Sequence, residues 1–275
     1  MTIEPIEPQA QAGAAGLFVM KCGGSTLAAL PDSFFEDLRE LQVSGIQPVI
    51  VHGGGPAISG NLEKLGIESR FVNGLRVTTE EVLDVVEMTL AGSINKAIVR
   101  RIQASGGQAL GLSGVDGNLI MAHPVANHDE VGLVGEVTGV RAEIVTGILA
   151  MGYIPVIAPV GVDGEGQRYN INADTAAGAV ASYIGSPSMI VVTDVPGIMR
   201  TVDGEKVVLP SVTVAQIEAL IENGEIYGGM IPKVCAAMDC IQGQVSEVII
   251  VDGKEPRVLS RVLKGEALGT RIVRA

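Results

Sequence analysis

The chain has 275 residues, 47% of them hydrophobic, and its 19 lysines and arginines against 31 aspartates and glutamates give a formal net charge of −12. No apolar run approaches the roughly 18 uninterrupted residues of a membrane span, and so acidic a chain has no basic footprint for nucleic acid. We therefore expect a soluble globular protein in which small anionic ligands need local, directed positive charge.

The N-terminal segment and the cysteines favour a reducing cytoplasm. Residues 1–16 contain acidic residues and prolines where a secretory signal would need a basic start and an apolar core, so we expect a flexible tail there. The three cysteines, Cys22, Cys235 and Cys240, form no C-x-x-C pair. Their odd number argues against a disulfide framework.

Apolar runs rich in β-branched residues predict strands that are buried on both faces, because their apolar character is nearly continuous. These runs are residues 16–21, 48–52, 153–160, 188–195 and 246–253. Helical patterns lie between them, which predicts an α/β fold with an open, mostly parallel central sheet sandwiched between helices. Ligands of such sheets bind beyond the carboxyl ends of the strands. At their carboxyl ends, several of these runs continue into segments with glycine or aspartate, which are KCGGS, HGGG, TDVPG and VDG.

Two S/T-x-x-E patterns predict the starts of helices. Ser33 and Glu36 are spaced as a capping box, and Gly45 stands where a glycine would end that helix. Thr78 and Glu81 have the same spacing ahead of a stripe of valines and leucines. Both patterns predict amphipathic helices between the strands.

The run His52-Gly53-Gly54-Gly55 follows the second predicted strand. Consecutive glycines let backbone N–H groups approach an anion without a Cβ in the way. Pro56 suits the first turn of a following helix, whose positive end would point to the same place. The alternative interpretation is a tight packing turn. His52 by itself is more typical of a hydrogen-bonded structural residue than of a ligand or a base.

Two lysines occupy positions that favour an anion. Lys21 ends the first strand beside Gly23 and Gly24, where an ammonium could lie next to phosphate oxygens. A lysine that extends from a strand end into water is the alternative. Lys233 falls in the first turn of a helix that Pro232 can begin. A cation there opposes the helix dipole, which is unfavourable unless an anion is held.

Polar residues before the next helix form a further candidate. Asn170, Asn172 and Asp174 could point at one ligand, although an N-cap would account for one of the three. The guanidinium of Arg76 could bind a carboxylate in bidentate fashion, or could form a surface salt bridge.

Familiar nucleotide motifs are absent from the sequence, since neither the GxxxxGK[ST] loop nor the GxGxxG fingerprint occurs. The histidines in residues 121–130 match no zinc spacing, and this segment is predicted to be a polar loop.

Taken together, these segments resemble the amino-acid kinase family from about residue 17 to the C-terminal GTRIV. The resemblance rests on KCGGS, VHGGGP, NGLRVT, SINK, GLSGVDGNL, YIPVIAPVGV, NINADTAA, TDVPGI and GGMIPKV. The combination of NGLRVT with NINAD is similar to the branch that acts on N-acetyl-L-glutamate. It implies phosphorylation of the γ-carboxylate by ATP to give N-acetyl-L-glutamyl 5-phosphate, the second step of arginine biosynthesis.

The resemblance also implies roles for individual residues. Lys21 and Lys233 match two lysines that stabilise the transferring phosphoryl group, and Asp174 matches the carboxylate that orients them. The residues matched to the acyl amino acid are Gly54, Gly55, Arg76 and Asn170. Those matched to the nucleotide are Gly23, Gly24, Thr193, Asp194, Gly197, Ile198, Gly229 and Met230. No residue is matched to a metal, because Mg²⁺ is expected to bind together with ATP.

The implied fold has an eight-stranded open sheet, and the implied assembly is a homodimer joined through the N-terminal lobe. We expect one domain over residues 17–275, with the acyl amino acid held by about 17–185 and the nucleotide by about 186–275. Arginine-inhibited members carry a histidine in the C-terminal segment, and none follows His128 here, which predicts insensitivity to arginine. The alternatives are a kinase for another acyl amino acid, such as an aminoadipate derivative, and a catalytically silent regulatory protein.

Overall fold

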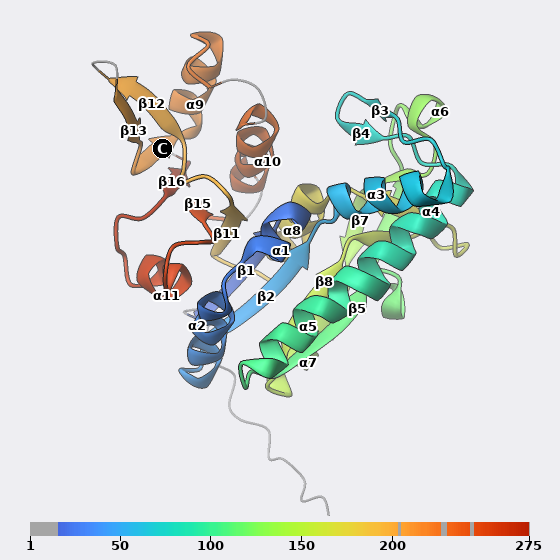
Figure 1. Ribbon diagram of the computed structural model, residues 1–275, viewed down its shortest axis with the longest axis horizontal. Helices are drawn as coiled ribbons and strands as arrows, with labels where there is room; N and C mark the ends of the chain where they lie inside the picture. Colours follow the sequence, from blue (N-terminus) through green and yellow to red (C-terminus); the bar gives the residue numbers. More distant parts are fainter. Residues whose placement is uncertain (1–15, 203–204, 227–229, 243–244, 275) are drawn as a thin grey trace, which may run out of the picture.

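The computed structural model describes residues 16–202, 205–226, 230–242 and 245–274. Its centre is an open eight-stranded sheet (Figure 1). The strands lie in the order β14 (Ser211–Thr213), β16 (Thr270–Val273), β15 (Glu247–Asp252), β11 (Ser188–Thr193), β1 (Leu17–Cys22), β2 (Gln47–His52), β8 (Ile154–Ala158) and β5 (Ala109–Ser113). Neighbours are parallel except for β15 and β16. The predicted α/β fold is confirmed, and each of the predicted apolar runs supplies a strand.

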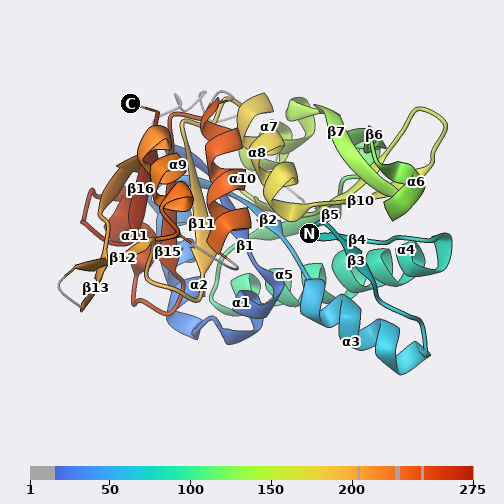
Figure 2. The same ribbon diagram turned by 90° about the horizontal axis from the view of Figure 1, so that it is seen from above.

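Helices cover both faces of this sheet (Figures 1 and 2). One face carries α7 (Ala142–Ala150), α8 (Ala173–Tyr183), α9 (Val214–Glu222) and α10 (Met230–Gln242). The other carries α2 (Asp32–Val43), α5 (Asn95–Ala104) and α11 (Val258–Leu263). Successive side chains of β1 alternate between the two cores, with Val19 in the first and Met20 in the second. Lys21 therefore lies on the face that α8 and α10 cover.

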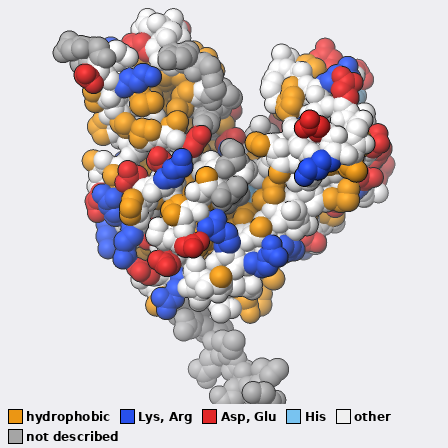
Figure 3. Space-filling view, viewed as in Figure 1, with side chains coloured by type: hydrophobic (Ala, Val, Ile, Leu, Met, Phe, Trp, Pro, Cys, Tyr) orange, Lys and Arg blue, Asp and Glu red, His pale blue; other side chains and the backbone are white. Residues whose placement is uncertain are grey.

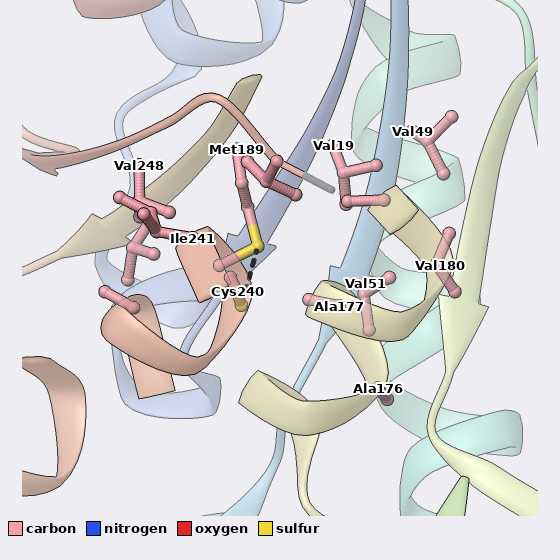
Figure 4. Close-up of a cluster of buried hydrophobic side chains, with 14 of the residues drawn as sticks. Val19, Val49, Val51, Ala176, Ala177, Val180, Met189, Cys240, Ile241 and Val248 are labelled. Carbon is pink, nitrogen blue, oxygen red and sulfur yellow. Dashed lines mark hydrogen bonds between the residues drawn. The ribbon is translucent and has the colours of Figure 1, made fainter. Parts of the chain in front are cut away.

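Small side chains allow α8 to pack closely against both the sheet and α10. Ala176, Ala177 and Val180 lie beside the valines of β1 and β2 (Figure 4). A Cβ added at Gly178 would lie 2.4 Å from Sγ of Cys240 in α10, so a larger residue would push the two helices apart. The small-residue sequence TAAGAVASY is thus explained by packing, and this packing sets the position of α10.

The carboxyl ends of the central strands meet at one edge of the sheet. Cys22 at the end of β1 pairs with His52 of β2 and is level with Val192 of β11, and Thr193 pairs with Asp252 of β15. The segments KCGGS, HGGG, TDVPG and VDG all leave the sheet here. The sequence prediction that these motifs share an edge is confirmed.

The helix starts differ from the predicted capping boxes. The N-cap of α2 is Pro31, and no side chain caps it, although Gly45 with a φ of +82° ends the helix as predicted. The N-cap of α4 (Glu80–Glu87) is Thr79, whose hydroxyl accepts a hydrogen bond from the N–H of Val82. Both predicted boxes are wrong. For the second, the physical reason is that the hydroxyl of Thr78 donates to the carbonyl of Arg76 instead.

Smaller elements surround the end of the sheet that carries β5. The strands β6 (Ile120–Pro124), β7 (Val134–Val140), β9 (Val160–Val162) and β10 (Arg168–Ile171) close into a small barrel. The predicted polar loop over residues 121–130 is therefore wrong in part, because β6 includes His123 and α6 (His128–Val131) begins at His128. Ile120 and Ala122 are buried in the barrel, and this period of two is the missed strand signal.

The remaining elements complete the two ends of the molecule. They are the short helix α1 (Gly24–Ala29), α3 (Gly55–Leu65), a π-helix over Met88–Ile94, a 3₁₀ turn over Asp116–Asn118, and the hairpins β3 (Phe71–Val72) with β4 (Leu75–Arg76) and β12 (Met199–Val202) with β13 (Glu205–Val208). The surface is hollowed between the parts that carry these two hairpins (Figure 3). Among the described residues, no helix is long and apolar enough to cross a membrane.

Candidate functional site

A cavity of about 240 Å³ lies at the carboxyl edge of β1 and β2. Its walls come from the turns β1–α1 and β2–α3, from the hairpin strand β4, and from the junction of β10 with α8. The predicted site residues that line it are Lys21, Gly23, Gly24, Gly54, Gly55, Arg76, Asn170 and Asp174. The fold thus brings together residues that are as much as 153 positions apart in sequence, as the pair Lys21 and Asp174 shows.

The two glycine turns are in direct backbone contact in this cavity. A Cβ added at Gly24 would lie 2.4 Å from Cα and 2.8 Å from N of Gly54. The N–H of Gly53 donates to the carbonyl of Cys22 at 2.9 Å, which joins the same two turns. Gly54 has a φ of −171°, an ordinary extended value, so close contact and not backbone strain requires glycine here.

Lys21 forms an ion pair with Asp174, with Nζ and Oδ1 2.9 Å apart. Their side chains are only 12% and 20% exposed. Asp174 lies in the first turn of α8, and the side chain of Asn172 caps that helix by accepting from the N–H groups of Asp174 and Thr175. The N-cap explanation thus accounts for Asn172, and it leaves Asn170 and Asp174 for the cavity. The pair holds the Lys21 ammonium in the cavity wall.

Arg76 is 6% exposed, and its guanidinium has no carboxylate partner among the described residues. It donates to the carbonyl of Gly55 at 3.0 Å and to the hydroxyls of Ser59 and Ser69, and it lies over the ring of Phe71. Desolvation lowers the pKa of Arg76 from its ordinary value. The alternative of a surface salt bridge therefore finds no carboxylate partner in the described part of the chain, and a buried cation of this kind is suited to an anionic ligand.

His52 is fully buried next to the cavity and belongs to a hydrogen-bond chain. Nδ2 of Asn95 lies 3.2 Å from Nε2 of His52, and Nδ1 of His52 lies 3.3 Å from the carbonyl of Gly53. Because an amide N–H donates, Nε2 is the acceptor and Nδ1 carries the proton. Burial above all lowers the pKa of His52 to about 4, and the charge of Lys96 adds to this effect. His52 is thus the structural residue that the sequence favoured.

Sequence reasoning missed two buried polar residues next to the site. Nδ2 of Asn95, in the segment SINK, also lies 3.2 Å from the carbonyl oxygen of Leu112 and 2.8 Å from that of Val156, so its two protons are shared among three acceptors. Asn95 thus joins the start of α5 to strands β5 and β8. Thr78 was interpreted only as a helix cap. Neither carried a local sequence signal, since Thr78 stands beside a second threonine and Asn95 stands among polar residues. Only their burial in the fold, where a polar group must find partners, reveals their roles.

Several residues predicted to bind the nucleotide do not line this cavity. Thr193 is buried at the end of β11, where its hydroxyl donates to the carbonyl of Val195 or Val251, and Asp194 is exposed. A Cβ at Gly197 would meet Thr270 and Val208. Ile198 is fully buried, its N–H donates to Thr270, and its carbonyl accepts from Leu209. The assignment of these residues to the nucleotide stays a prediction.

The remaining predicted residues belong to the start of α10. Met230 is the first residue of α10 and packs against the core, and Lys233 lies in the first turn as predicted. The side chain of Lys233 and the whole of Gly229 fall outside the described residues. Their roles also stay predictions.

The charge pattern of the cavity suits two anions. Lys21 and Arg76 supply cations, and α3 and α8 both begin in the cavity wall, so that their positive ends point into it. Asp174 is already paired with Lys21. In a chain with a net charge of −12, this is the local, directed positive charge that anionic ligands need.

Comparison with known proteins agrees with this geometry. The profile of the amino acid kinase family matches residues 16–252. The chain belongs to this family. An acetylglutamate kinase of Geobacillus kaustophilus is 51% identical over 236 residues, covering 86% of this chain and 90% of the relative. That of Halalkalibacterium halodurans is 47% identical over 258 residues, covering 93% of this chain and 95% of the relative.

A solved structure extends the comparison to three dimensions. A protein of Streptococcus mutans UA159 superposes on this amino acid kinase with a TM-score of 0.82 at 30% sequence identity, and the match covers 95% of this chain and 100% of the other. The predicted resemblance to the amino-acid kinase family is therefore confirmed in both sequence and fold.

We expect Gly24→Ala to disturb both stability and activity, because its methyl group would overlap the backbone of Gly54, which cannot move aside as a flexible side chain can. The expected loss is roughly 1–3 kcal/mol in the free energy of unfolding and more than about tenfold in turnover. Denaturant unfolding and a kinase assay measure these. Gly60→Ala in α3 is the control, since its Cβ would meet nothing within 4 Å. Equal stability and activity of both variants would contradict the close contact.

We expect His52 to make the protein less stable as the pH falls. Its pKa is about 4 in the folded state and about 6.5 in the unfolded chain, so the unfolded state takes up the proton first. Stability from this group is present above pH 6.5 and is lost toward pH 4, with a change of about 2 kcal/mol between pH 7 and pH 5. His52→Gln should lack this part of the pH dependence in denaturant unfolding. The exposed His123→Gln should keep it, and a His52→Gln slope equal to wild type would refute the assignment.

Proposed function

We propose that this amino acid kinase transfers the γ-phosphoryl group of ATP to the γ-carboxylate of N-acetyl-L-glutamate. The products are N-acetyl-L-glutamyl 5-phosphate and ADP, and the reaction is the second step of arginine biosynthesis. The names and coverage of the relatives support this function. The observation that carries it in the molecule is a cavity that brings Lys21 and the paired glycine turns together with the guanidinium of Arg76, which has no carboxylate partner among the described residues.

The chemistry needs charge and alignment more than it needs a base. The γ-carboxylate is ionised at neutral pH, because its ordinary pKa is about 4.3. One of its oxygens attacks the γ-phosphorus while the bond from that phosphorus to the bridging oxygen breaks, and ADP leaves with the electron pair. The obstacle is repulsion between two anions, and cations and N–H donors reduce it. This agrees with a cavity in which Lys21 and Arg76 supply cations, Asn170 supplies an amide, and the carboxylate of Asp174 is paired with Lys21.

In this proposal each cavity residue has a defined task. Arg76 pairs with the α-carboxylate of the substrate, and the amide of Asn170 hydrogen-bonds to the same molecule. Gly54 and Gly55 contact the acyl amino acid, while Gly23 and Gly24 approach the phosphates. Lys21, oriented by Asp174, neutralises the phosphoryl group during transfer. These tasks place the acyl amino acid and the phosphates on opposite sides of the glycine contact.

The nucleotide side of the proposal rests on the family resemblance. Lys233 would add a second positive charge at the phosphoryl group from the first turn of α10. ATP would be held by about residues 186–275, through segments that include Thr193, Asp194, Gly197, Ile198, Gly229 and Met230. The acyl amino acid would be held by about residues 17–185. Both parts contribute strands to the same sheet, which keeps the two halves of the site together.

Mg²⁺ is the expected metal and would neutralise phosphate charge when bound. The described residues contain no group of three or more His, Cys, Asp and Glu side chains placed to hold a metal ion. Asp174 is already engaged with Lys21. These residues therefore fit a metal that is bound mainly by the phosphates of ATP and not by a protein cage.

We further propose a cytoplasmic homodimer. Strand β5 pairs only with β8 among the described strands, so one of its edges is open, and its Leu110 is 42% exposed. An open edge of this kind is normally covered, and a second copy of the N-terminal part would cover it. A cytoplasmic location agrees with the free cysteines Cys22 and Cys240, both buried. Light scattering would contradict the dimer if it gave a monomer or a hexamer.

The function is tested by direct assay. The purified enzyme is given ATP and Mg²⁺ with N-acetyl-L-glutamate, glutamate, aspartate or N-acetylaminoadipate, and the acyl phosphate is trapped with hydroxylamine. We expect kcat/KM for N-acetyl-L-glutamate to exceed that for each other acceptor by at least about 100-fold. Absence of hydroxamate from N-acetyl-L-glutamate would refute the proposal. A preference for N-acetylaminoadipate would replace the substrate but keep the reaction type.

We expect Lys21→Ala to reduce turnover far more than substrate binding, because the charge is needed most in the transition state. The expected loss in kcat is at least about 100-fold, with KM for N-acetyl-L-glutamate within about threefold of wild type. Lys233→Ala should behave in the same way. Lys64→Ala, at an exposed lysine of α3, is the control. A Lys21→Ala enzyme with unchanged kcat and a raised KM would contradict the assigned role.

A further inference from the structure

Thr78 lies between the two elements that carry the polar groups for the acyl amino acid. It follows β4, which holds Arg76, and its backbone pairs with Gly132, the N–H donating to Val131 and the carbonyl accepting from Leu133. The carbonyl of Leu133 in turn accepts from the N–H of Asn170 at 2.9 Å. Thr78 is 0% exposed and does not line the cavity, so it cannot touch a ligand itself.

The hydroxyl of Thr78 joins Arg76 to Asn170 and fixes the direction of both hydrogen bonds. Oγ1 of Thr78 lies 2.7 Å from the carbonyl oxygen of Arg76 and 3.2 Å from Nδ2 of Asn170. A carbonyl oxygen can only accept, so the single hydroxyl proton is donated to Arg76. Toward Asn170 the hydroxyl can then only accept. The atom of Asn170 that faces Thr78 must therefore be Nδ2, the amide nitrogen.

This orientation decides which atoms of Asn170 remain for the cavity. One N–H of Nδ2 is used by Thr78, and no described residue donates to Oδ1. Asn170 lines the cavity, so it offers an acceptor, Oδ1, together with one remaining N–H donor. If the amide of Asn170 were flipped, Nδ2 and its N–H groups would take the place in the cavity that the acceptor Oδ1 now has. An acceptor at this place matches an N–H group of a ligand, and the donor matches a carboxylate held by Arg76.

We propose that Thr78 is a positioning residue that locks the Asn170 amide so that Oδ1 accepts the amide N–H of the substrate. This inference rests on the proposed function, whose substrate carries such an N–H beside its α-carboxylate. The hydroxyl of Thr78 acts through Asn170 and through the backbone of Arg76. Removing it lets the amide rotate, and it leaves a buried carbonyl without its donor.

The test compares an amide substrate with its ester isostere. In 2-acetoxyglutarate an oxygen replaces the N–H, so only the contact to Oδ1 is lost. We expect wild type to prefer N-acetyl-L-glutamate by at least about tenfold in kcat/KM, because an acceptor facing an ester oxygen is left unpaired. In Thr78→Val, an isosteric change without the hydroxyl, this preference should fall to about threefold or less. KM for N-acetyl-L-glutamate should rise about tenfold, with KM for ATP and kcat within about threefold of wild type.

Matched variants separate this role from general damage to the structure. Thr78→Ser keeps the hydroxyl and should restore the preference for the amide. Thr89→Val is the control, since Thr89 is also buried and its hydroxyl also accepts from an asparagine amide, that of Asn61 at 2.9 Å, and neither of these two residues lines the cavity. It should keep the wild-type preference. If Thr78→Val does not fold, Thr78→Cys, with a weak acceptor of similar size, is measured in its place.

The outcomes distinguish the two proposals. If wild type neither phosphorylates N-acetyl-L-glutamate nor binds it in calorimetry, the proposed function fails and the inference fails with it. If wild type is active and the preference for the amide is the same in wild type, Thr78→Val and Thr78→Ser, only the role of Thr78 is refuted. Support for the role of Thr78 requires three results together. Thr78→Val loses the preference for the amide, Thr78→Ser restores it, and Thr89→Val keeps it.

Discussion

The backbone contact between Gly24 and Gly54 is the constraint on which the rest of the site depends. It joins the turn after β1 to the turn after β2, and a single Cβ at Gly24 would separate them. In the proposed reaction, the carboxylate and the phosphoryl group must also approach each other across these turns. The strands below hold the turns in place, since β1 and β2 are parallel and in register up to the pair Cys22 and His52.

Electrostatics are arranged around this contact so that an acidic protein can hold two anions. Lys21 is kept in the cavity wall by Asp174, while the guanidinium of Arg76 is held by hydroxyl and carbonyl oxygens. The difference matters physically. A cation paired with a carboxylate keeps its orientation but has part of its charge compensated, whereas a cation held by neutral oxygens keeps its full attraction for a ligand. The first arrangement suits a charge that acts during transfer, and the second suits firm binding of a substrate carboxylate.

Much of the fold could be predicted because its signals are local. Continuous apolar runs bounded by glycine identified the strands at 17–22, 47–52 and 188–193, and helical spacing identified α2 and α4 to within a few residues. The barrel strand β6 and the helix caps were missed, because a short alternating run and a Thr-Thr pair are ambiguous until their neighbours are known. For the site, Lys21, Arg76, Asn170 and Asp174 could be named in advance as candidates. Their partners could not, since Ser59, Thr78 and Asn95 show no pattern that differs from ordinary surface or capping residues.

The sequence by itself determined the fold class, the edge of the sheet at which a ligand must bind, and the family, because apolar periodicity, glycine turns and their order are properties of the chain alone. Only the tertiary structure decided which candidates meet. It paired Lys21 with Asp174, surrounded Arg76 with hydroxyl and carbonyl oxygens, made His52 a buried neutral residue and oriented the amide of Asn170. The physical reason is that charge, desolvation and hydrogen-bond direction depend on distances between segments far apart in sequence, and packing alone sets those distances.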